Sequence, residues 1–88
     1  MTFKVYILYS LIKDRYYIGQ TQDVERRLHE HNSRHSKSTR SGIPWKLVFI
    51  REFENRSDAV LFEMQLKRMK SRKYIQEQIN INFQYIIN

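Results

Sequence analysis

The chain has 88 residues, no cysteine and a formal charge of +7, from 16 Lys and Arg against 9 Asp and Glu. This length excludes a two-domain enzyme and predicts one compact unit, residues 1–88, with a small core. The absence of cysteine excludes disulfides, zinc–thiolate sites and a cysteine nucleophile. The excess of cations favours a polyanionic partner: nucleic acid is the first candidate and an anionic membrane surface the second.

The hydrophobic pattern predicts a cytoplasmic protein. The longest apolar stretch, Val5 to Ile12, is far shorter than the ~20 residues that span a bilayer. Lys13, Asp14 and Arg15 follow it, where a signal peptide would carry small residues for cleavage. The content of 41% hydrophobic and 28% charged residues is typical of a folded chain and not of a disordered one.

The first two expected elements are strands of a β-hairpin. Residues 3–9 and 16–18 are rich in β-branched and aromatic side chains, with the polar Lys13 and Asp14 between them. The hairpin is expected to end at Gly19. From Thr21, a possible N-cap, Val24, Leu28 and His31 recur at helical spacing, which predicts a helix over about residues 22–33.

The middle of the chain predicts a loop and then a third strand. Residues 33–44 contain four serines and several cations without periodicity, which is typical of a mobile basic loop. Residues 45–53 alternate as a strand does, with one face expected to carry Trp45, Leu47 and Phe49 and the other Val48 and Ile50.

A second helix is expected from Asn55 or Ser57, either of which can cap it, to about Lys70. Its expected apolar face consists of Ala59, Phe62, Leu66 and Met69. Residues 74–88 fit a short helix or a strand equally well and are expected to form a C-terminal extension. The order ββαβα predicts a small α/β (α+β) fold: a three-stranded antiparallel sheet flanked by helices, with that helix or extension at its end.

Several polar side chains fall where packing would place apolar ones. Arg27 and His31 share the expected buried side of the first helix, whereas Arg26 faces water, and Glu63 interrupts the apolar face of the second. Tyr6 and Tyr17 are expected to form a cross-strand pair beside Gly19. Simpler alternatives stay open: the Arg27 head group can reach water, the tyrosines can be ordinary packing, and Glu63 can pair with Lys67.

These positions resemble the GIY-YIG nuclease superfamily. Its first motif appears as Val5-Tyr6-Ile7, with Val5 at the place of a glycine, and its second as Tyr17-Ile18-Gly19. Residues 23–32 resemble its arginine-bearing helix, and Glu63 lies in a segment like its acidic helix. The likeness runs from about Phe3 to Arg72 and is strongest to small stand-alone members similar to the N-terminal domain of the excision-repair endonuclease C subunit. The family's asparagine has two candidates here, Asn80 and Asn82.

The resemblance implies a divalent-metal-dependent endonuclease that hydrolyses phosphodiester bonds, with DNA favoured over RNA. It implies Mg²⁺ (or Mn²⁺) on Glu63, the only protein ligand, and Arg27 on the scissile phosphate. Tyr6, assisted by Tyr17, is expected to accept a proton from the attacking water, which requires Arg27 and the metal to favour its ionised form. His31 is the second candidate for the base, or a residue that orients the site. Repair or recombination, with weak sequence preference or selectivity for DNA structure, is the expected context.

Two basic clusters are expected to bind the nucleic-acid backbone. The members are Arg34, Lys37 and Arg40 in the loop, and Lys67, Lys70, Arg72 and Lys73 around the end of the second helix. Two other functions stay open: a catalytically inactive nucleic-acid-binding module of the same fold, and a basic adaptor or membrane-surface protein. A protein partner for targeting is compatible with each of them.

Overall fold

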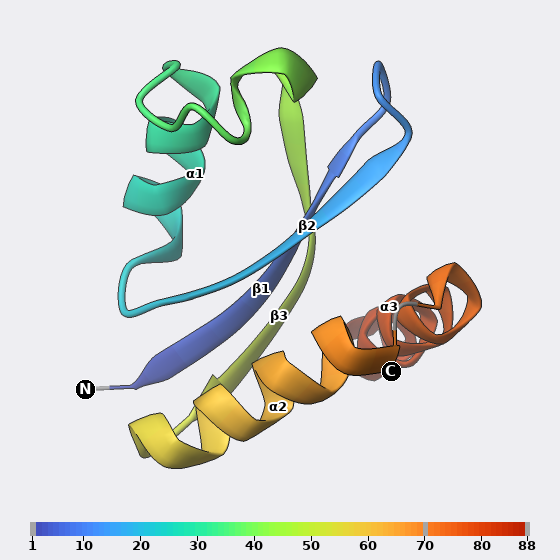
Figure 1. The fold of residues 1–88 in the computed structure, drawn as a ribbon. Coiled ribbons are helices and arrows are strands. Elements are labelled where there is room, and N and C mark those ends of the chain that lie inside the picture. Colours follow the sequence, from blue (N-terminus) through green and yellow to red (C-terminus); the bar gives the residue numbers. More distant parts are fainter. Residues whose placement is uncertain (1, 70, 88) are drawn as a thin grey trace.

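The computed structural model describes residues 2–69 and 71–87. Strands and helices follow one another in the order ββαβαα, with a 3₁₀ turn before the third strand (Figure 1). The elements are β1 (Phe3–Ser10), β2 (Arg15–Thr21), α1 (Val24–Asn32), the 3₁₀ turn η1 (Arg40–Gly42), β3 (Trp45–Phe53), α2 (Arg56–Met69) and α3 (Arg72–Ile87). The predicted mixed α/β fold with a three-stranded antiparallel sheet is confirmed. The C-terminal region, open between helix and strand, forms the helix α3.

The sheet has the order β2-β1-β3, with β1 antiparallel to both neighbours. β1 takes the central place because both of its faces are apolar, and every side chain from Val5 to Leu8 is buried. The β1–β3 register shifts between Ile7, which faces Phe49, and Leu8, which faces Leu47. The extra residue on β3 is a β-bulge that turns Phe49 to the opposite face from Leu47. The prediction that Trp45, Leu47 and Phe49 share one face is therefore wrong beyond Leu47.

Helices cover the two faces of the sheet separately, as Figure 1 shows. On one face, α2 and α3 contribute Ala59, Phe62, Leu66 and Ile75 to a core with Val5, Ile7 and Phe49. On the other face, Leu28 of α1 packs against Tyr6, Leu8 and Trp45. The alternation of side chains along β1 therefore assigns Tyr6 to the α1 layer and its neighbours to the α2 layer.

Side-chain caps define where the helices begin. Asp23 Oδ1 accepts from the Arg26 amide at 3.1 Å, so Asp23 is the N-cap of α1 and the predicted cap, Thr21, is wrong. Thr21 Oγ1 accepts instead from the Asp23 amide at 3.1 Å. Asn55 Oδ1 accepts from the Asp58 amide at 2.9 Å and fills the predicted capping role for α2.

Two further expectations are corrected. Met69 is 49% exposed, because it is the last residue of α2 and the core on this face of the sheet takes its last α2 side chain from Leu66. The segment 33–44 is not irregular throughout, since η1 forms within it and Thr39 and Gly42 are buried. Trp45 Nε1 donates to the Thr39 carbonyl at 2.7 Å and fastens this segment to β3. Of the helices in residues 2–69 and 71–87, none has the length and apolarity needed to cross a bilayer.

Candidate active site

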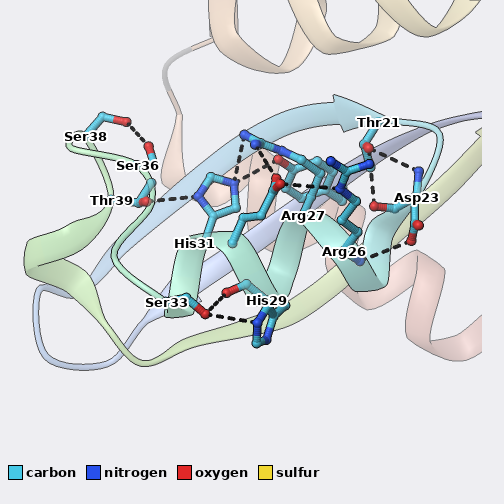
Figure 2. Close-up of polar contacts among 12 residues, drawn as sticks. Thr21, Asp23, Arg26, Arg27, His29, His31, Ser33, Ser36, Ser38 and Thr39 are labelled. Carbon is cyan, nitrogen blue, oxygen red and sulfur yellow. Dashed lines mark hydrogen bonds and ion pairs between the residues drawn. The ribbon is translucent and has the colours of Figure 1, made fainter.

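His31 lies fully buried between α1 and the sheet, and both of its ring nitrogens have polar neighbours. Nε2 lies 3.0 Å from the Tyr6 hydroxyl, and Nδ1 lies 2.9 Å from the Thr39 hydroxyl. Arg27 Nη2 also approaches Nε2, at 3.4 Å; Figure 2 shows the ring between Thr39 and Arg27. A guanidinium can only donate, so Nε2 is the acceptor and Nδ1–H donates to Thr39. This network favours a Tyr6 hydroxyl that donates to His31.

Electrostatics keeps both partners of this contact neutral. Burial, and then the charge of Arg27, lower the pKa of His31 below its ordinary value, so the imidazole is uncharged at neutral pH. Burial raises the pKa of Tyr6, and the interaction with Arg27 opposes this effect without reversing it. The expectation that Arg27 favours ionised Tyr6 is therefore right in direction but outweighed by desolvation in the protein alone. Tyr6 is a phenol, and the neutral His31 beside it is the stronger base.

Arg27 is held at the margin of this cluster. Its Nη1 donates to Glu30 Oε1 at 2.8 Å, while its side chain keeps 36% of its surface exposed. Arg26 is 76% exposed, which confirms that Arg27 and His31 share the inner side of α1. Sequence reasoning missed Glu30, although its i, i+3 spacing from Arg27 is a recognised signal for an ion pair. Glu30 fixes one edge of the guanidinium and leaves Nη2 beside Tyr6 and His31.

The strand register differs from the expected tyrosine pair. Tyr6 faces Gly19, and Tyr17 faces Leu8, so the two phenols are diagonal neighbours with ring centroids 6.3 Å apart. Tyr17 lies edge-on to His31 with a centroid distance of 4.7 Å. A Cβ atom at Gly19 would lie 2.5 Å from the Tyr6 hydroxyl oxygen, so only glycine lets this hydroxyl approach the edge strand.

Glu63 lies on the other side of β2. Its Oε1 accepts from Gln20 Nε2 at 3.4 Å and its Oε2 from Lys67 Nζ at 2.8 Å, and 19% of its side chain is exposed. Gln20 follows Gly19 in β2, and strand alternation puts its side chain on the opposite face from Gly19, so Glu63 meets this edge strand from the α2 layer. The Glu63 charge is still the least of the causes that raise the Tyr6 pKa. The structure thus gathers Tyr6, Tyr17, Arg27 and His31, while Glu63 makes the Lys67 pair that the sequence left open.

The donor set at Glu63 fits a hard cation with few protein ligands. In the described part of the chain, no three His, Cys, Asp or Glu side chains gather as a metal cage. Mg²⁺ keeps several waters and binds one or two carboxylates together with substrate phosphate, which one carboxylate beside the Gln20 amide can satisfy. Lys67 occupies the other carboxylate oxygen and is a competing cation at this place.

Neither candidate for the family's asparagine lies beside Glu63. Asn82 donates from Nδ2 to the Ile50 carbonyl at 3.0 Å, on β3, the edge strand opposite β2. Asn80 is exposed and lines a groove between α3 and β3 together with Asn82. The sequence left this position open between Asn80 and Asn82, and the structure places both of them at the groove beside β3.

Some of the cations predicted to bind the nucleic-acid backbone are free on the surface of the described residues, and others pair with acidic side chains. Arg34, Lys37 and Arg40 are exposed on the segment after α1, and Lys73 is exposed on α3. Lys67 pairs with Glu63. Arg72 donates from Nη1 to Asp14 Oδ1 at 2.8 Å and from Nη2 to the Asp14 carbonyl at 2.6 Å. Lys70 lies outside the described residues.

Thr39 is the site residue that sequence reasoning missed without a usable signal. It is 1% exposed and lies among serines and cations, in a segment without periodicity. Its carbonyl accepts from Trp45 Nε1 and from the Gly42 amide, at 2.7 and 3.1 Å. These contacts place its hydroxyl at His31 Nδ1, so the segment after α1 completes the polar cluster.

Comparison with known proteins finds one matching family model and several similar proteins. A family model described as the GIY-YIG catalytic domain matches residues 3–76. A UPF0213 protein of Streptococcus pneumoniae is 40% identical over 72 residues, which cover 80% of this chain and 73% of that protein. A UPF0213 protein of Haloquadratum walsbyi is 40% identical over 70 residues, 75% of this chain and 79% of its own. The solution NMR structure of a UPF0213 protein from Bacillus halodurans matches with a TM-score of 0.60 and 32% identity, over 92% of this chain and 85% of that chain.

Proposed function

Because the chain belongs to the GIY-YIG nuclease family and, within it, to the UPF0213 proteins, we propose that it is a divalent-metal-dependent endonuclease that hydrolyses phosphodiester bonds in DNA. The observation that carries this proposal is the Tyr6–His31 contact, with Arg27 at its margin. A neutral imidazole, a phenol and a permanent cation supply a proton acceptor, a relay and a phosphate ligand in one place.

The proton path follows from the protonation states. A water that attacks phosphorus gives its proton to the Tyr6 oxygen, while the Tyr6 hydroxyl proton passes to His31 Nε2. Thr39 accepts from Nδ1–H and keeps the lone pair on Nε2, so it is a positioning residue. Tyr17 packs edge-on against the imidazole and limits its rotation. In this path Tyr6 relays the proton and His31 is the final base.

Arg27 and Glu63 have different roles at the scissile phosphate. The Arg27 guanidinium, fixed by Glu30, stabilises the extra negative charge on the scissile phosphate, a contribution worth about 10²–10³ in rate for one well-placed donor. Glu63 is the residue that would hold Mg²⁺ or Mn²⁺, which when bound would stabilise the departing 3′ oxygen. Gln20 of the edge strand β2 donates to one oxygen of the Glu63 carboxylate and Lys67 of α2 to the other.

Substrate choice is proposed from the charge distribution. The exposed cations Arg34, Lys37 and Arg40, together with Lys73, bind phosphates, which carry no sequence information. We therefore propose structure-selective or weakly sequence-specific cleavage, of DNA in preference to RNA, in repair or recombination within the cytoplasm. Lys67 and Arg72 are weaker candidates for DNA contact, because each already pairs with a carboxylate.

Cleavage assays with the Glu63→Ala and Arg27→Ala variants test the proposed function. Nicked, branched and plasmid DNA are incubated with each protein in Mg²⁺, Mn²⁺ or EDTA. We expect metal-dependent cutting by the wild type and a loss of about 10²-fold or more in both variants. DNA affinity of Glu63→Ala, measured in EDTA, should change little. The Arg26→Ala variant is the matched control, because it removes the 76% exposed neighbouring arginine of the same helix, which points away from the polar cluster, and should keep the cleavage rate.

A catalytically inactive nucleic-acid-binding module is the second candidate. Two observations favour it: Glu63 approaches the sheet from the α2 layer whereas Tyr6 belongs to the α1 layer, and Asn82 bonds to β3, the edge strand opposite β2. It predicts salt-sensitive DNA binding by the wild type without cutting in either metal. A reproducible metal-dependent cut that Arg27→Ala abolishes excludes it.

A further inference from the structure

Two aliphatic side chains stand in solvent at the tip of the β1–β2 hairpin. Leu11 is 79% and Ile12 67% exposed, the two highest values among the large hydrophobic side chains of residues 2–69 and 71–82. Tight turns are normally built from Gly, Asn, Asp, Ser and Pro, which supply the required backbone angles and remain hydrated. These two consecutive apolar residues belong to neither hydrophobic core of the described side chains.

Hydrogen bonds hold this tip in one conformation. The Lys13 amide donates to the buried Ser10 hydroxyl at 3.1 Å, across the turn. Asp14 has φ of 50°, and its Oδ1 accepts from the Tyr9 hydroxyl at 2.7 Å. Arg72 of α3 donates to the carboxylate and to the carbonyl of Asp14, at 2.8 and 2.6 Å. A left-handed aspartate held by Tyr9 of the hairpin and by Arg72 of the distant helix α3 makes the hairpin tip a preorganised projection.

Cations surround the hairpin tip. Lys13 and Arg15 follow the tip residues in the chain, and Lys46 faces Tyr9 across the β1–β3 ladder, all with exposed side chains. The turn η1, with its exposed Arg40, lies at the same end of the molecule (Figure 1). It packs there so closely that a Cβ atom at Gly42 would lie 3.0 Å from Ser10 Oγ. Asp14 is acidic, but Arg72 neutralises it.

We propose that the hairpin tip, Leu11 and Ile12, is a wedge that enters DNA where base stacking is already broken. This proposal rests on the proposed endonuclease function. It identifies interrupted base stacking as the feature of the DNA substrate that the protein recognises. DNA-binding proteins often insert apolar side chains between adjacent base pairs, which gives apolar contact with the bases but costs free energy because the bases unstack. That cost is least at a nick, a branch or an unpaired base, so the wedge selects these structures over intact duplex. The surrounding cations bind the flanking phosphates.

A binding experiment in EDTA isolates the wedge from cleavage. Anisotropy is measured for the full chain on a nicked duplex, a branched duplex and an intact duplex of equal length, each with 2-aminopurine at the central step. We expect the wild type to prefer the interrupted duplexes by roughly tenfold and to raise 2-aminopurine fluorescence by unstacking. The Leu11→Ser/Ile12→Ser variant should lose both effects while its affinity for intact duplex stays within about twofold.

The matched control is Leu61→Ser/Met64→Ser, which removes two exposed apolar side chains from α2 and should behave as the wild type. Thermal unfolding checks that both variants fold. A tip variant that keeps the preference for interrupted duplex overturns the wedge and leaves the proposed endonuclease untouched. Wild-type protein that binds no DNA overturns both. Binding to anionic vesicles that only the tip variant loses, with its DNA preference retained, assigns the tip to a membrane surface and overturns the wedge.

Discussion

The Tyr6 hydroxyl lies 3.0 Å from His31 Nε2, a contact between the central strand and α1 across 25 positions of the chain. Burial acts on the two groups in opposite directions, since it raises the pKa of the phenol and lowers that of the imidazole. Both groups are therefore neutral near pH 7, with the proton on the oxygen and the lone pair on the nitrogen. Before any reaction, the Tyr6 hydroxyl is therefore the donor of this contact and His31 Nε2 is the acceptor. Substitutions that remove one of these groups test its role.

Replacing Tyr6 by Phe removes the relay and keeps the ring. We expect the cleavage rate to fall by about 10²–10⁴-fold, the range for a positioned proton-transfer group. The free energy of unfolding should fall by only about 1–2 kcal/mol, because His31 Nε2 keeps Arg27 as a neighbour. Single-turnover cleavage and urea unfolding measure the two effects. Tyr74→Phe is the control, since that hydroxyl accepts from Gln65 in the other layer, and an equal loss of rate there contradicts the relay.

Replacing Thr39 by Val removes the acceptor for His31 Nδ1–H at constant side-chain volume. We expect the imidazole to lose its tautomer preference, with a fall in cleavage rate of roughly tenfold and a loss of about 1–3 kcal/mol in stability. Nitrogen chemical shifts of the His31 ring report the tautomer directly. Thr39→Ser restores the hydroxyl and should recover both the rate and the shifts. Unchanged ring shifts in Thr39→Val contradict a positioning role.

Cleavage should depend on the neutral form of His31. Its pKa is lowered from the ordinary value of 6.5, chiefly by burial and then by Arg27, so activity should persist below pH 6.5 and fall only at lower pH. The same shift makes the unfolded chain bind more protons than the folded one between the two pKa values. Stability from His31 is therefore complete above pH 6.5 and is lost as pH falls through the folded pKa.

Urea unfolding of the wild type and of His31→Asn across pH 4.5–7.5 measures this linkage (about three pH units that bracket the ordinary histidine value). The difference in stability between the two proteins should grow as pH rises and level off above pH 6.5. His29→Asn, at an exposed position of the same helix, is the control. A difference that shrinks with rising pH would reverse the sign and refute the assignment of His31 as a buried neutral base.

Replacing Lys67 by Met removes the cation that competes at Glu63 Oε2. We expect Mn²⁺ to bind the variant several-fold more tightly, because the carboxylate is no longer neutralised, while DNA affinity changes little. Mn²⁺ titration followed by electron paramagnetic resonance gives the metal affinity without a cleavage assay. Glu63→Gln should abolish the binding. Should Lys67→Met instead weaken DNA binding and lower the salt slope by about 1, Lys67 is a phosphate contact as first predicted.

The sequence by itself determined the three strands, the first two helices and four members of the polar cluster, Tyr6, Tyr17, Arg27 and His31. Helical spacing assigned Arg27 and His31 to one face, strand alternation assigned Tyr6 to the sheet, and the Tyr17-Ile18-Gly19 motif located the edge where they meet. These are local signals, since side-chain direction follows from the period of the element. The same reasoning went wrong at Phe49, because a single bulge residue on β3 reverses the face of all that follows.

Only the tertiary structure decided which groups share a layer and which charge state they take. Thr39 reaches His31 because η1 and Trp45 fold the segment after α1 back onto the sheet, and no periodicity encodes that path. Gly19 is required at its place because Tyr6 faces it across the ladder. Glu63 faces β2 from the opposite layer, which depends on how α2 crosses the sheet. Burial, a property of the packed chain alone, separates the pKa values of Tyr6 and His31 and so keeps the resting proton on the Tyr6 oxygen and the lone pair on the imidazole.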